Sequence, residues 1–179
     1  MSPPAVLARR LPQPMTATCV SVLVLGLGND LLGDDAVGLH VARSVRSRLE
    51  GQPDCAVRET MEMGLALLDE IVGCEHLLLI DSIETGKAPP GHVHEFDAES
   101  LAGRRIAAPH FVGIVETLAL GRTLGLAMPR NVQVFAIEVK DAFTLSVALT
   151  PEVQRVVESA ADRISACAAR LARPRSNES

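Results

Sequence analysis

Two carboxylates and an imidazole stand at equivalent points of three segments of the sequence. Asp35 follows an apolar stretch and a glycine turn, Asp81 ends a second apolar stretch, and His110 opens a segment with helical spacing. Two oxygen ligands and one nitrogen ligand suit a divalent metal ion. The same groups could equally work as general acid and general base. We take these three residues as the candidate site and leave both chemistries open.

Each of the three residues also has a structural explanation. An aspartate at the head of a helix caps free N–H groups, which stabilises the helix by about 0.5–2 kcal/mol. One cap accounts for either Asp34 or Asp35 and leaves the other acid, together with Asn29, without a role. Asp81 could cap a turn, and His110 could be an ordinary first-turn residue. It is their convergence on one crevice that favours a site.

An alternation of apolar and amphipathic segments predicts a fold that would bring them together. The segments 20–25 and 76–81 are mainly apolar, and the second ends in Asp81, as strands buried on both faces can. The alternation indicates an α/β fold, a mostly parallel twisted sheet of about five strands with helices on both faces. In such sheets ligands bind beyond the carboxyl ends of the strands. The expected strands are 20–25, 55–59, 76–81, 92–96 and 131–139, and the expected helices are 35–49, 62–72, 110–125 and 150–171.

The chain is expected to contain one domain with short tails. It has 179 residues, 47% of them hydrophobic, which is enough to bury a full core. Residues 1–18 carry prolines and arginines without a helical or strand period, which predicts a disordered N-terminal extension. Residues 19–172 form the predicted α/β domain, and the polar residues 173–179 form a frayed tail.

Composition argues against several classes of protein. The formal net charge is −5, whereas a nucleic-acid binder normally presents a basic face. The sequence has no apolar run near the roughly 20 residues that a membrane span needs. The 4 cysteines are scattered without a C-x-x-C pair, which is typical of thiols in a reducing compartment. We therefore expect a cytoplasmic protein that binds neither nucleic acid nor membrane.

The glycine-rich turn after the first expected strand raises a nucleotide-dependent α/β enzyme as one alternative. Gly26 and Gly28 are expected to turn the backbone sharply at the end of this strand. A dinucleotide fingerprint needs its third glycine where the chain has Leu31, and two acids would face the pyrophosphate. Glu59, at the end of the second expected strand, is the feature that favours a ribose site. The nucleotide alternative is thus disfavoured.

Other polar residues fit structural roles better than chemical ones. His92 and His94 lie two residues apart on one side of an expected edge strand, where solvated side chains are commoner than metal ligands. Ser82 has no base partner nearby in the sequence, and neither a G-x-S-x-G elbow nor an H-E-x-x-H motif is present. Standard serine-hydrolase and zinc-protease chemistry is therefore disfavoured.

Motifs that follow one another along the chain resemble one family, the nickel–iron hydrogenase maturation endopeptidases. Residues 25–38, LGLGNDLLGDDAVG, closely resemble its opening motif. Residues 77–83, LLLIDSI, match its second acidic strand end, and Pro109-His110 with the apolar helix behind it matches its histidine segment. Residues 148–153, ALTPEV, match the start of its last helix. The resemblance covers about residues 20–170.

The resemblance implies a function and a set of site residues. By a residue-by-residue match, Asp35, Asp81 and His110 correspond to the proposed metal-contacting and catalytic residues of the family. The implied reaction is removal of a C-terminal extension from the precursor of a hydrogenase large subunit after nickel insertion. The nickel belongs to the substrate and serves as the recognition signal, so the resemblance identifies no resident cofactor.

The segment after the second expected strand departs from the family pattern. Family members often carry an Asp-Gly-Gly-Thr-like run there, whereas this chain has ETMEMG at residues 59–64. We assign Gly64 and Glu62 to substrate binding, although a solvated or capping role also fits Glu62. Asn29 is assigned to orienting the loop or the peptide. The departure leaves open which hydrogenase is processed, and it motivates a second alternative, a non-catalytic chaperone that binds nickel or the precursor.

Overall fold

The structure, a computed structural model, describes residues 20–98 and 109–172. Within the second range, the side chains of residues 109–112 lie outside the description. The described part of the chain thus leaves out two predicted features, the N-terminal extension (1–18) and the tail (173–179). It also leaves out Cys19 and the side chain of His110.

Within the described residues, five strands form one sheet. They span Val22–Leu27 (β1), Cys55–Thr60 (β2), His76–Ile83 (β3), Val93–Asp97 (β4) and Asn131–Glu138 (β5). Their order is β2-β1-β3-β5-β4, and β4 runs antiparallel to β5 while the other pairs are parallel. Gly26 of β1 lies opposite Ile80 of β3, so the carboxyl ends of these neighbours meet at one edge. The predicted sheet is confirmed.

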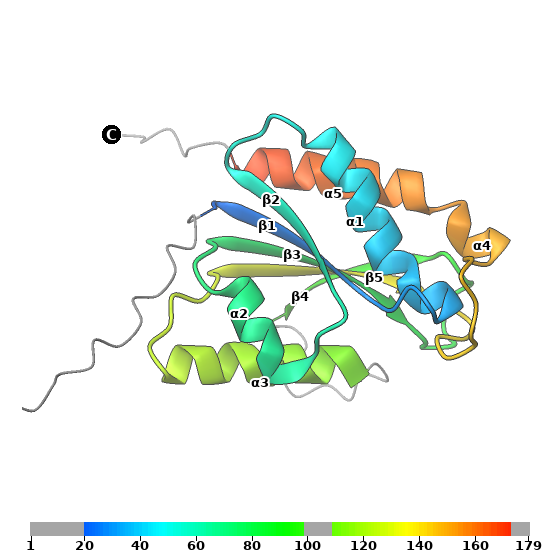
Figure 1. Cartoon of the computed structure of the whole chain (residues 1–179), viewed down its shortest axis with the longest axis horizontal. Coiled ribbons are helices and arrows are strands. Elements are labelled where there is room, and N and C mark those ends of the chain that lie inside the picture. Colours follow the sequence, from blue (N-terminus) through cyan, green and yellow to red (C-terminus); the bar gives the residue numbers. More distant parts are fainter. Residues whose placement is uncertain (1–19, 99–108, 173–179) are drawn as a thin grey trace, which may run out of the picture.

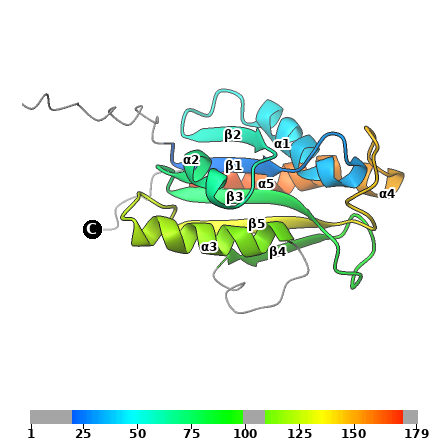
Figure 2. The same cartoon turned by 60° about the horizontal axis from the view of Figure 1, so that its bottom comes forward.

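Helices cover both faces of the sheet, as predicted (Figure 1, Figure 2). One face carries α1 (Val37–Arg48) and α5 (Val157–Leu171). The other carries α2 (Leu67–Ile71) and α3 (Pro109–Thr123), while α4 (Pro151–Gln154) precedes α5. In the described segments, none of these helices combines the length and the apolar character that crossing a bilayer requires.

The two faces of the central strands belong to two separate cores. Because side chains alternate along a strand, Val22 and Val24 pack with α1 and α5, whereas Leu23 and Leu25 pack with α2 and α3. All four side chains are at most 1% exposed. Full burial of each stabilises the fold by about 1.5–3 kcal/mol. This two-sided burial is why continuous apolar runs in the sequence indicated the central strands correctly.

Glycines allow α1 to start directly against the carboxyl ends of β1 and β3. A Cβ at Gly38 would lie 2.2 Å from the backbone oxygen of Leu27 and 2.6 Å from that of Ile80. Gly28 has a φ of 145°, and a Cβ there would lie 2.2 Å from the backbone oxygen of Asp35. The turn is therefore folded tightly back onto the residues that precede α1.

Several predicted boundaries near the site are wrong. Gly26 lies inside β1 and not in the turn, because the strand continues to Leu27 and a Cβ at Gly26 would meet the Gly38 oxygen at 2.4 Å. The helix predicted at 35–49 begins with a 3-10 turn, η1 (Gly33–Ala36), that precedes α1. The strand that contains Asp81 continues beyond this residue to the end of β3.

The later helices also differ from their predicted spans. The helix predicted at 62–72 is shortened to the 3-10 turn η2 (Gly64–Ala66) followed by α2. Met63, one of the apolar residues that suggested the longer helix, is 54% exposed. The helix predicted at 150–171 is divided into α4 and α5. The segment between β2 and α2 therefore has much less regular structure than its apolar spacing indicated.

Candidate active site

Ser82 joins the two predicted acids at the carboxyl edge of the sheet. Its hydroxyl donates a hydrogen bond to Asp35 Oδ1 at 3.0 Å, and its N–H donates to Asp81 Oδ1 at 2.8 Å. The exposed fractions are 6% for Asp35, 0% for Asp81 and 7% for Ser82. Hydrogen bonds to a charged carboxylate are roughly twice as strong as neutral ones, so these contacts orient both acids.

The backbone explains why the acids meet. Asp81 lies in β3, opposite Ala136 of the parallel strand β5, and Asp35 lies in η1 directly after the tight turn that ends β1. Since β1 and β3 are adjacent and parallel, residues at their carboxyl ends are neighbours. Removing carboxylates from water is costly, and buried charges in proteins are usually paired or bound to metal ions. This arrangement suits a positively charged group.

The neighbouring acid, Asp34, has a structural role instead. Its Oδ1 accepts the N–H of Thr150 at 2.6 Å, and its Oδ2 accepts the Thr150 hydroxyl at 2.8 Å. Thr150 occupies the N-cap position of α4, but its side chain forms no capping hydrogen bond to that helix. Asp34 thus ties the turn after β1 to the start of α4, while Asp35 contacts Ser82.

A pocket of about 140 Å³ opens beside Asp35. Its walls come from the turn after β1, with Asn29, and from the segment after β2, with Glu62. Asn29 orients its own loop, because its Oδ1 accepts the N–H of Leu31 at 3.0 Å. Glu62 is exposed, and its N–H donates to Thr60 Oγ1 at 3.0 Å. The lining residues are Leu27, Gly28, Asn29, Leu32, Asp35, Met61, Glu62 and Met63.

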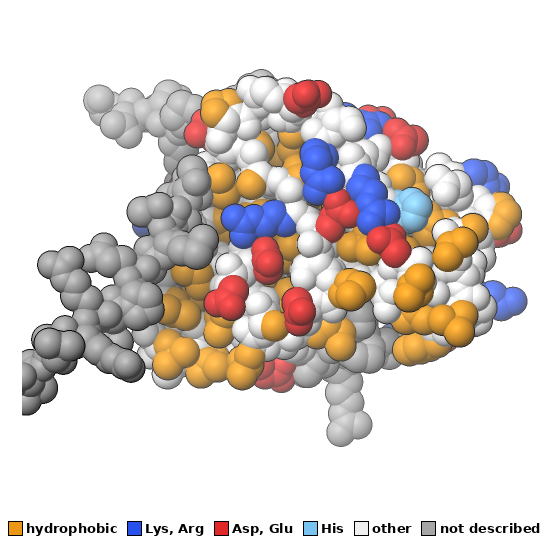
Figure 3. Space-filling view, in the orientation of Figure 1, with side chains coloured by type: hydrophobic (Ala, Val, Ile, Leu, Met, Phe, Trp, Pro, Cys, Tyr) orange, Lys and Arg blue, Asp and Glu red, His pale blue; other side chains and the backbone are white. Residues whose placement is uncertain are grey.

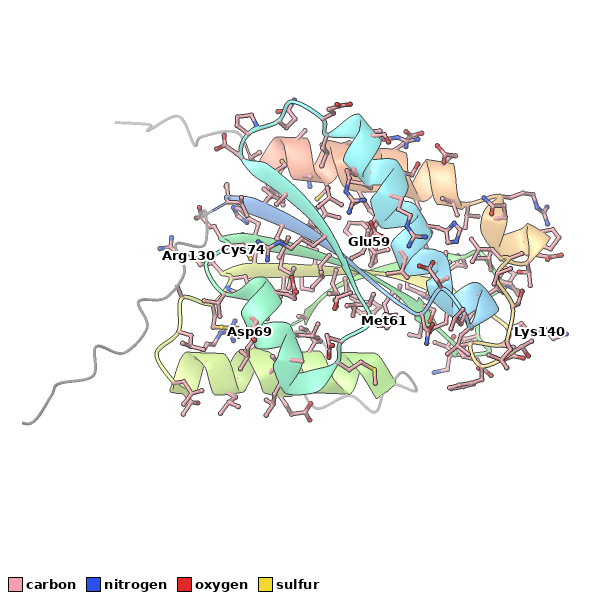
Figure 4. The ribbon with its side chains drawn as sticks, in the orientation of Figure 1. Glu59, Met61, Asp69, Cys74, Arg130 and Lys140 are labelled. Carbon is pink, nitrogen blue, oxygen red and sulfur yellow. The ribbon has the colours of Figure 1, made fainter. Side chains whose placement is uncertain are left out.

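Arg43 of α1 joins the turn after β1 to the end of β2, next to the two walls of this pocket. Its terminal nitrogens bind both carboxylate oxygens of Asp30, at 2.9 and 2.6 Å, and its Nε donates to Glu59 Oε2 at 2.7 Å. Arg46 adds a contact of 2.6 Å to Glu59. Asp30 lies in the turn after β1, and Glu59 lies in β2 beside α1, as Figure 4 shows. The hydrogen bond from Arg43 holds the pKa of Asp30 below its ordinary value.

Comparison with known proteins decides the family. The family model described as hydrogenase maturation protease (HycI) matches residues 39–167. The chain belongs to this family. The match contains Asp81 and His110, and it begins four residues after Asp35. As a member of the maturation proteases, the chain is an endopeptidase.

Individual maturation proteases agree with this assignment. The hydrogenase 2 maturation protease of Escherichia coli (strain K12) is 26% identical over 148 residues, which cover 81% of this chain and 88% of the relative. The endopeptidase HybD of E. coli gives a TM-score of 0.66 at 26% identity, covering 83% of this chain and 91% of that one. HybD from Thermococcus kodakarensis gives a TM-score of 0.63 at 27% identity, with coverage of 83% and 99%.

In this maturation protease, Gly64 supports the helix that carries His110. The backbone oxygen of Gly64 accepts the hydroxyl of Thr117 at 2.9 Å, and a Cβ at Gly113 would lie 3.5 Å from the Gly64 Cα. His110 is the second residue of α3, one turn before Gly113. The start of α3 therefore lies beside the segment after β2, at the same edge of the sheet as Asp35.

The predicted metal ligands stay a prediction. Among the side chains that the structure describes, which exclude that of His110, no group of three or more His, Cys, Asp or Glu residues could hold a metal ion. The structure brings Asp35 and Asp81 together through Ser82 and places the backbone of His110 at the start of α3. It places Asn29 and Glu62 on the pocket wall and Gly64 behind it.

His94, a possible metal ligand in the sequence, takes part in a different cluster. Its Nε2 lies 2.8 Å from Glu138 Oε2, and the Glu138 side chain is 1% exposed. Glu138 also accepts hydrogen bonds from the N–H groups of Thr85 and Gly86, both at 2.8 Å. Burial acts to raise the pKa of Glu138, but the hydrogen bonds from Thr85, His94 and Gly86 outweigh it and lower this pKa. This cluster fixes the loop after β3.

Sequence reasoning missed the roles of Ser82 and Arg43. The position of Ser82 next to Asp81 was visible, but its partner Asp35 lies 47 residues away. Arg43 follows Asp30 by 13 residues and precedes Glu59 by 16. Since Glu59 is bound by two arginines, its side chain has a structural partner, and the sequence argument for a ribose site loses its support.

Proposed function

We propose that this endopeptidase removes the C-terminal extension from the precursor of a [NiFe]-hydrogenase large subunit after nickel insertion. The observation that carries the proposal is the pair of buried acids, Asp35 and Asp81, joined by Ser82 beside an open pocket. Buried carboxylates favour a cation, and a nickel ion held by the precursor would supply one. The membership in the maturation proteases supplies the reaction type.

Each site residue has an assigned task. Asp35, Asp81 and His110 contact the nickel of the precursor and place the peptide bond that is cleaved. A water molecule attacks the carbonyl carbon of that bond, and a carboxylate accepts one proton of the water. The carboxylic acid then gives this proton to the amide nitrogen as the C–N bond breaks, which releases the extension as an amine and leaves a carboxyl group on the precursor. Ser82 is a positioning residue, because it orients Asp35 through its hydroxyl. Asn29 and Glu62, on the pocket wall, contact the substrate peptide, and Gly64 sets the position of that wall.

Selection for loaded precursors follows from the same charges. A precursor without nickel brings no cation to the two acids, so it binds more weakly than a loaded one. Nickel is then cargo of the substrate, and the partner is the precursor itself. We assign the reaction to the cytoplasm, in keeping with the free thiols of Cys55 and Cys167.

Intact-mass analysis of a large-subunit precursor, incubated with this protein with and without nickel, tests the proposal. We expect loss of one C-terminal peptide in the nickel sample alone. The Asp35→Asn variant should leave the loaded precursor intact. Binding of the loaded precursor without mass loss would instead favour the chaperone alternative, which the altered segment 59–64 motivates. Equal cleavage of empty and loaded precursors would contradict nickel selection.

A further inference from the structure

Exposed apolar side chains gather at the carboxyl edge of the sheet. We call them the apolar rim, and each is between 54% and 82% exposed. Figure 3 shows hydrophobic side chains grouped on this face, beyond the Arg–Asp–Glu cluster that lies over α1. Soluble proteins rarely leave a contiguous apolar patch uncovered unless it binds something. The rim comprises Leu31, Met61, Met63, Phe143, Leu145 and Val147.

The rim is continuous with the candidate site. Met61 and Met63 line the pocket beside Asp35. Leu31 belongs to the turn that forms the opposite wall, and its backbone oxygen accepts the N–H of Ser146 at 3.1 Å. A second hydrogen bond, from Gly33 N–H to the Ser146 oxygen at 2.8 Å, completes a short parallel bridge. This bridge places the segment 143–147 against the turn that carries the site.

The segment 143–147 presents its side chains in an ordered way. Asp141 accepts the N–H groups of Phe143 and Thr144 at 2.7 and 3.1 Å, and the Thr144 hydroxyl at 2.5 Å. Phe143, Leu145 and Val147 are 74%, 80% and 82% exposed, while Ser146 is held against Leu31 and Gly33 by its backbone hydrogen bonds. Because the segment is already held, binding through it loses little conformational entropy.

The width of the rim indicates what covers it. Its residues come from three segments, the loops after β2, β1 and β5, and the bridge at Leu32 holds the last of these directly beside the turn after β1. Bridged segments lie about 4.8 Å apart, so three neighbouring rows of side chains span about 10 Å. A single extended peptide would cover one such row, roughly half of that width. The face of a folded protein fits this width better. That face should be apolar, because the nearby carboxylates of Asp30 and Asp141 already have partners within this chain and do not call for a charged partner.

We propose that the apolar rim docks an apolar face of the folded body of the protein substrate, away from the bond that Asp35 and Asp81 cleave. The inference rests on the proposed function, because it takes the precursor as the protein that reaches the site. Docking supplies affinity and selects the substrate, while the acids supply the chemistry. The rim should therefore act on KM and leave the chemical step unchanged.

Steady-state cleavage of the nickel-loaded precursor tests this inference. We expect the double variant Leu145→Ser/Val147→Ser to raise KM about tenfold or more and to keep kcat within about twofold. Met61→Ser, from a different loop, should raise KM in the same way. The matched control is Leu124→Ser, because Leu124 is 61% exposed at the end of α3 and outside the rim. Circular dichroism of each variant checks that the fold is kept.

The outcomes separate the inference from the proposed function. If the parent protein cleaves nothing, the proposed function fails, whatever the variants do. If the parent cleaves and the rim variants keep its KM, docking through the rim is wrong. The same holds if Leu124→Ser impairs KM equally. If sedimentation shows a dimer of the parent that the rim variants dissociate without a change in KM, a second copy of this chain covers the rim, and the inference is overturned.

Discussion

Two segments of this protein follow parallel strands and form walls of the same pocket, yet they are built in opposite ways. The turn after β1 leads into the buried residues Asp34 and Asp35, is closely packed around Gly28 and Gly38, and is fixed by hydrogen bonds to Thr150 and Ser82. The segment after β2 exposes Met61, Glu62 and Met63 and leads into a single 3-10 turn. The first segment holds the candidate chemical groups in place, and the second presents exposed side chains that we propose contact the substrate. Rigidity and recognition are thus divided between two neighbouring loops.

The sharpest test of this division concerns the adjacent acids of the rigid turn. Asp35→Asn keeps the shape and an oxygen acceptor for Ser82 but removes the charge that faces the site. We expect cleavage of the nickel-loaded precursor, measured as kcat/KM, to fall by about 10²–10⁴, the range of a lost acid–base group. A variant that cleaves at the parental rate would remove Asp35 from the mechanism.

Glycine replacements should distinguish the packed start of α1, which backs the turn after β1, from the segment after β2 by their effect on stability. A Cβ at Gly38 meets two backbone oxygens, so Gly38→Ala forces α1 away from β1 and β3. We expect a loss of roughly 2–4 kcal/mol in the free energy of unfolding, measured by urea denaturation. The control is Gly64→Ala: its φ of 59° is unfavourable for alanine, but no described atom lies within 4 Å of its Cβ. That variant should lose only about 1–2 kcal/mol, and equal losses would contradict the contrast.

Asp34→Asn should separate structure from chemistry within one pair of residues. Asp34 accepts two hydrogen bonds from Thr150, and asparagine can accept only through one oxygen. We expect a loss of about 1–3 kcal/mol in unfolding free energy. Cleavage at a temperature where the variant is fully folded should stay within a few fold of the parent. Thr150→Val removes the hydroxyl from the other side and should give a similar stability loss with cleavage retained.

Arg43→Lys should loosen the connection between the two walls without unfolding the protein. Lysine keeps the charge but cannot reproduce the contacts of Arg43 with Asp30 and Glu59. Because these groups are partly exposed, we expect a stability loss of only about 1 kcal/mol. The pocket walls would lie less firmly together, so KM for the precursor should rise a few fold while kcat changes little. An unchanged KM would show that the walls keep their places without Arg43.

The smallest expected effect is a pH dependence at Asp30. Its pKa is lowered by the hydrogen bond from Arg43, so the folded state favours the charged form. The stabilisation is therefore complete above the ordinary pKa of an aspartate and is lost as the pH falls through the lowered value. Since Asp30 is about half exposed, we expect this stabilisation to be under about 1 kcal/mol. It is measured as the difference in unfolding free energy between the parent and Asp30→Asn, followed across this acidic pH range. A difference that does not change with pH would contradict the assignment.

The rigid part of the molecule was the more predictable one. The buried strands β1 and β3 appear in the sequence as continuous apolar runs, and polar residues at their carboxyl ends are expected to converge. Asp35 and Asp81 could be singled out for that reason. Ser82 and Arg43 could not, because their partners are set by strand order and helix placement and not by local spacing.

The segment after β2 was the least predictable. Met63 has helical spacing with Ala66, Leu67 and Ile71, which predicted a helix over 62–72, but Met63 is 54% exposed and Met61, just before this span, is 68% exposed. Apolar spacing indicates a buried helix face only where another element covers that face. The α-helix in this region, α2, begins only at Leu67, so residues 61–63 lie outside it. Gly26 was likewise expected in the turn, because the sequence does not show that Gly38 of α1 lies against it.

The bond between Asp34 and Thr150 has a consequence for how the enzyme becomes active during synthesis. It joins residues 116 positions apart, and the contacts of Arg48 with Asp162 and of Ser44 with Glu158 each span 114 positions. Contacts of such long range form only after the intervening chain is available, and they slow folding. A chain that lacks Thr150 lacks the hydrogen bonds that fix Asp34 in the turn after β1. We therefore expect the turn that carries Asp35 to be completed only after α4 and α5 have been synthesised and α5 has docked on α1.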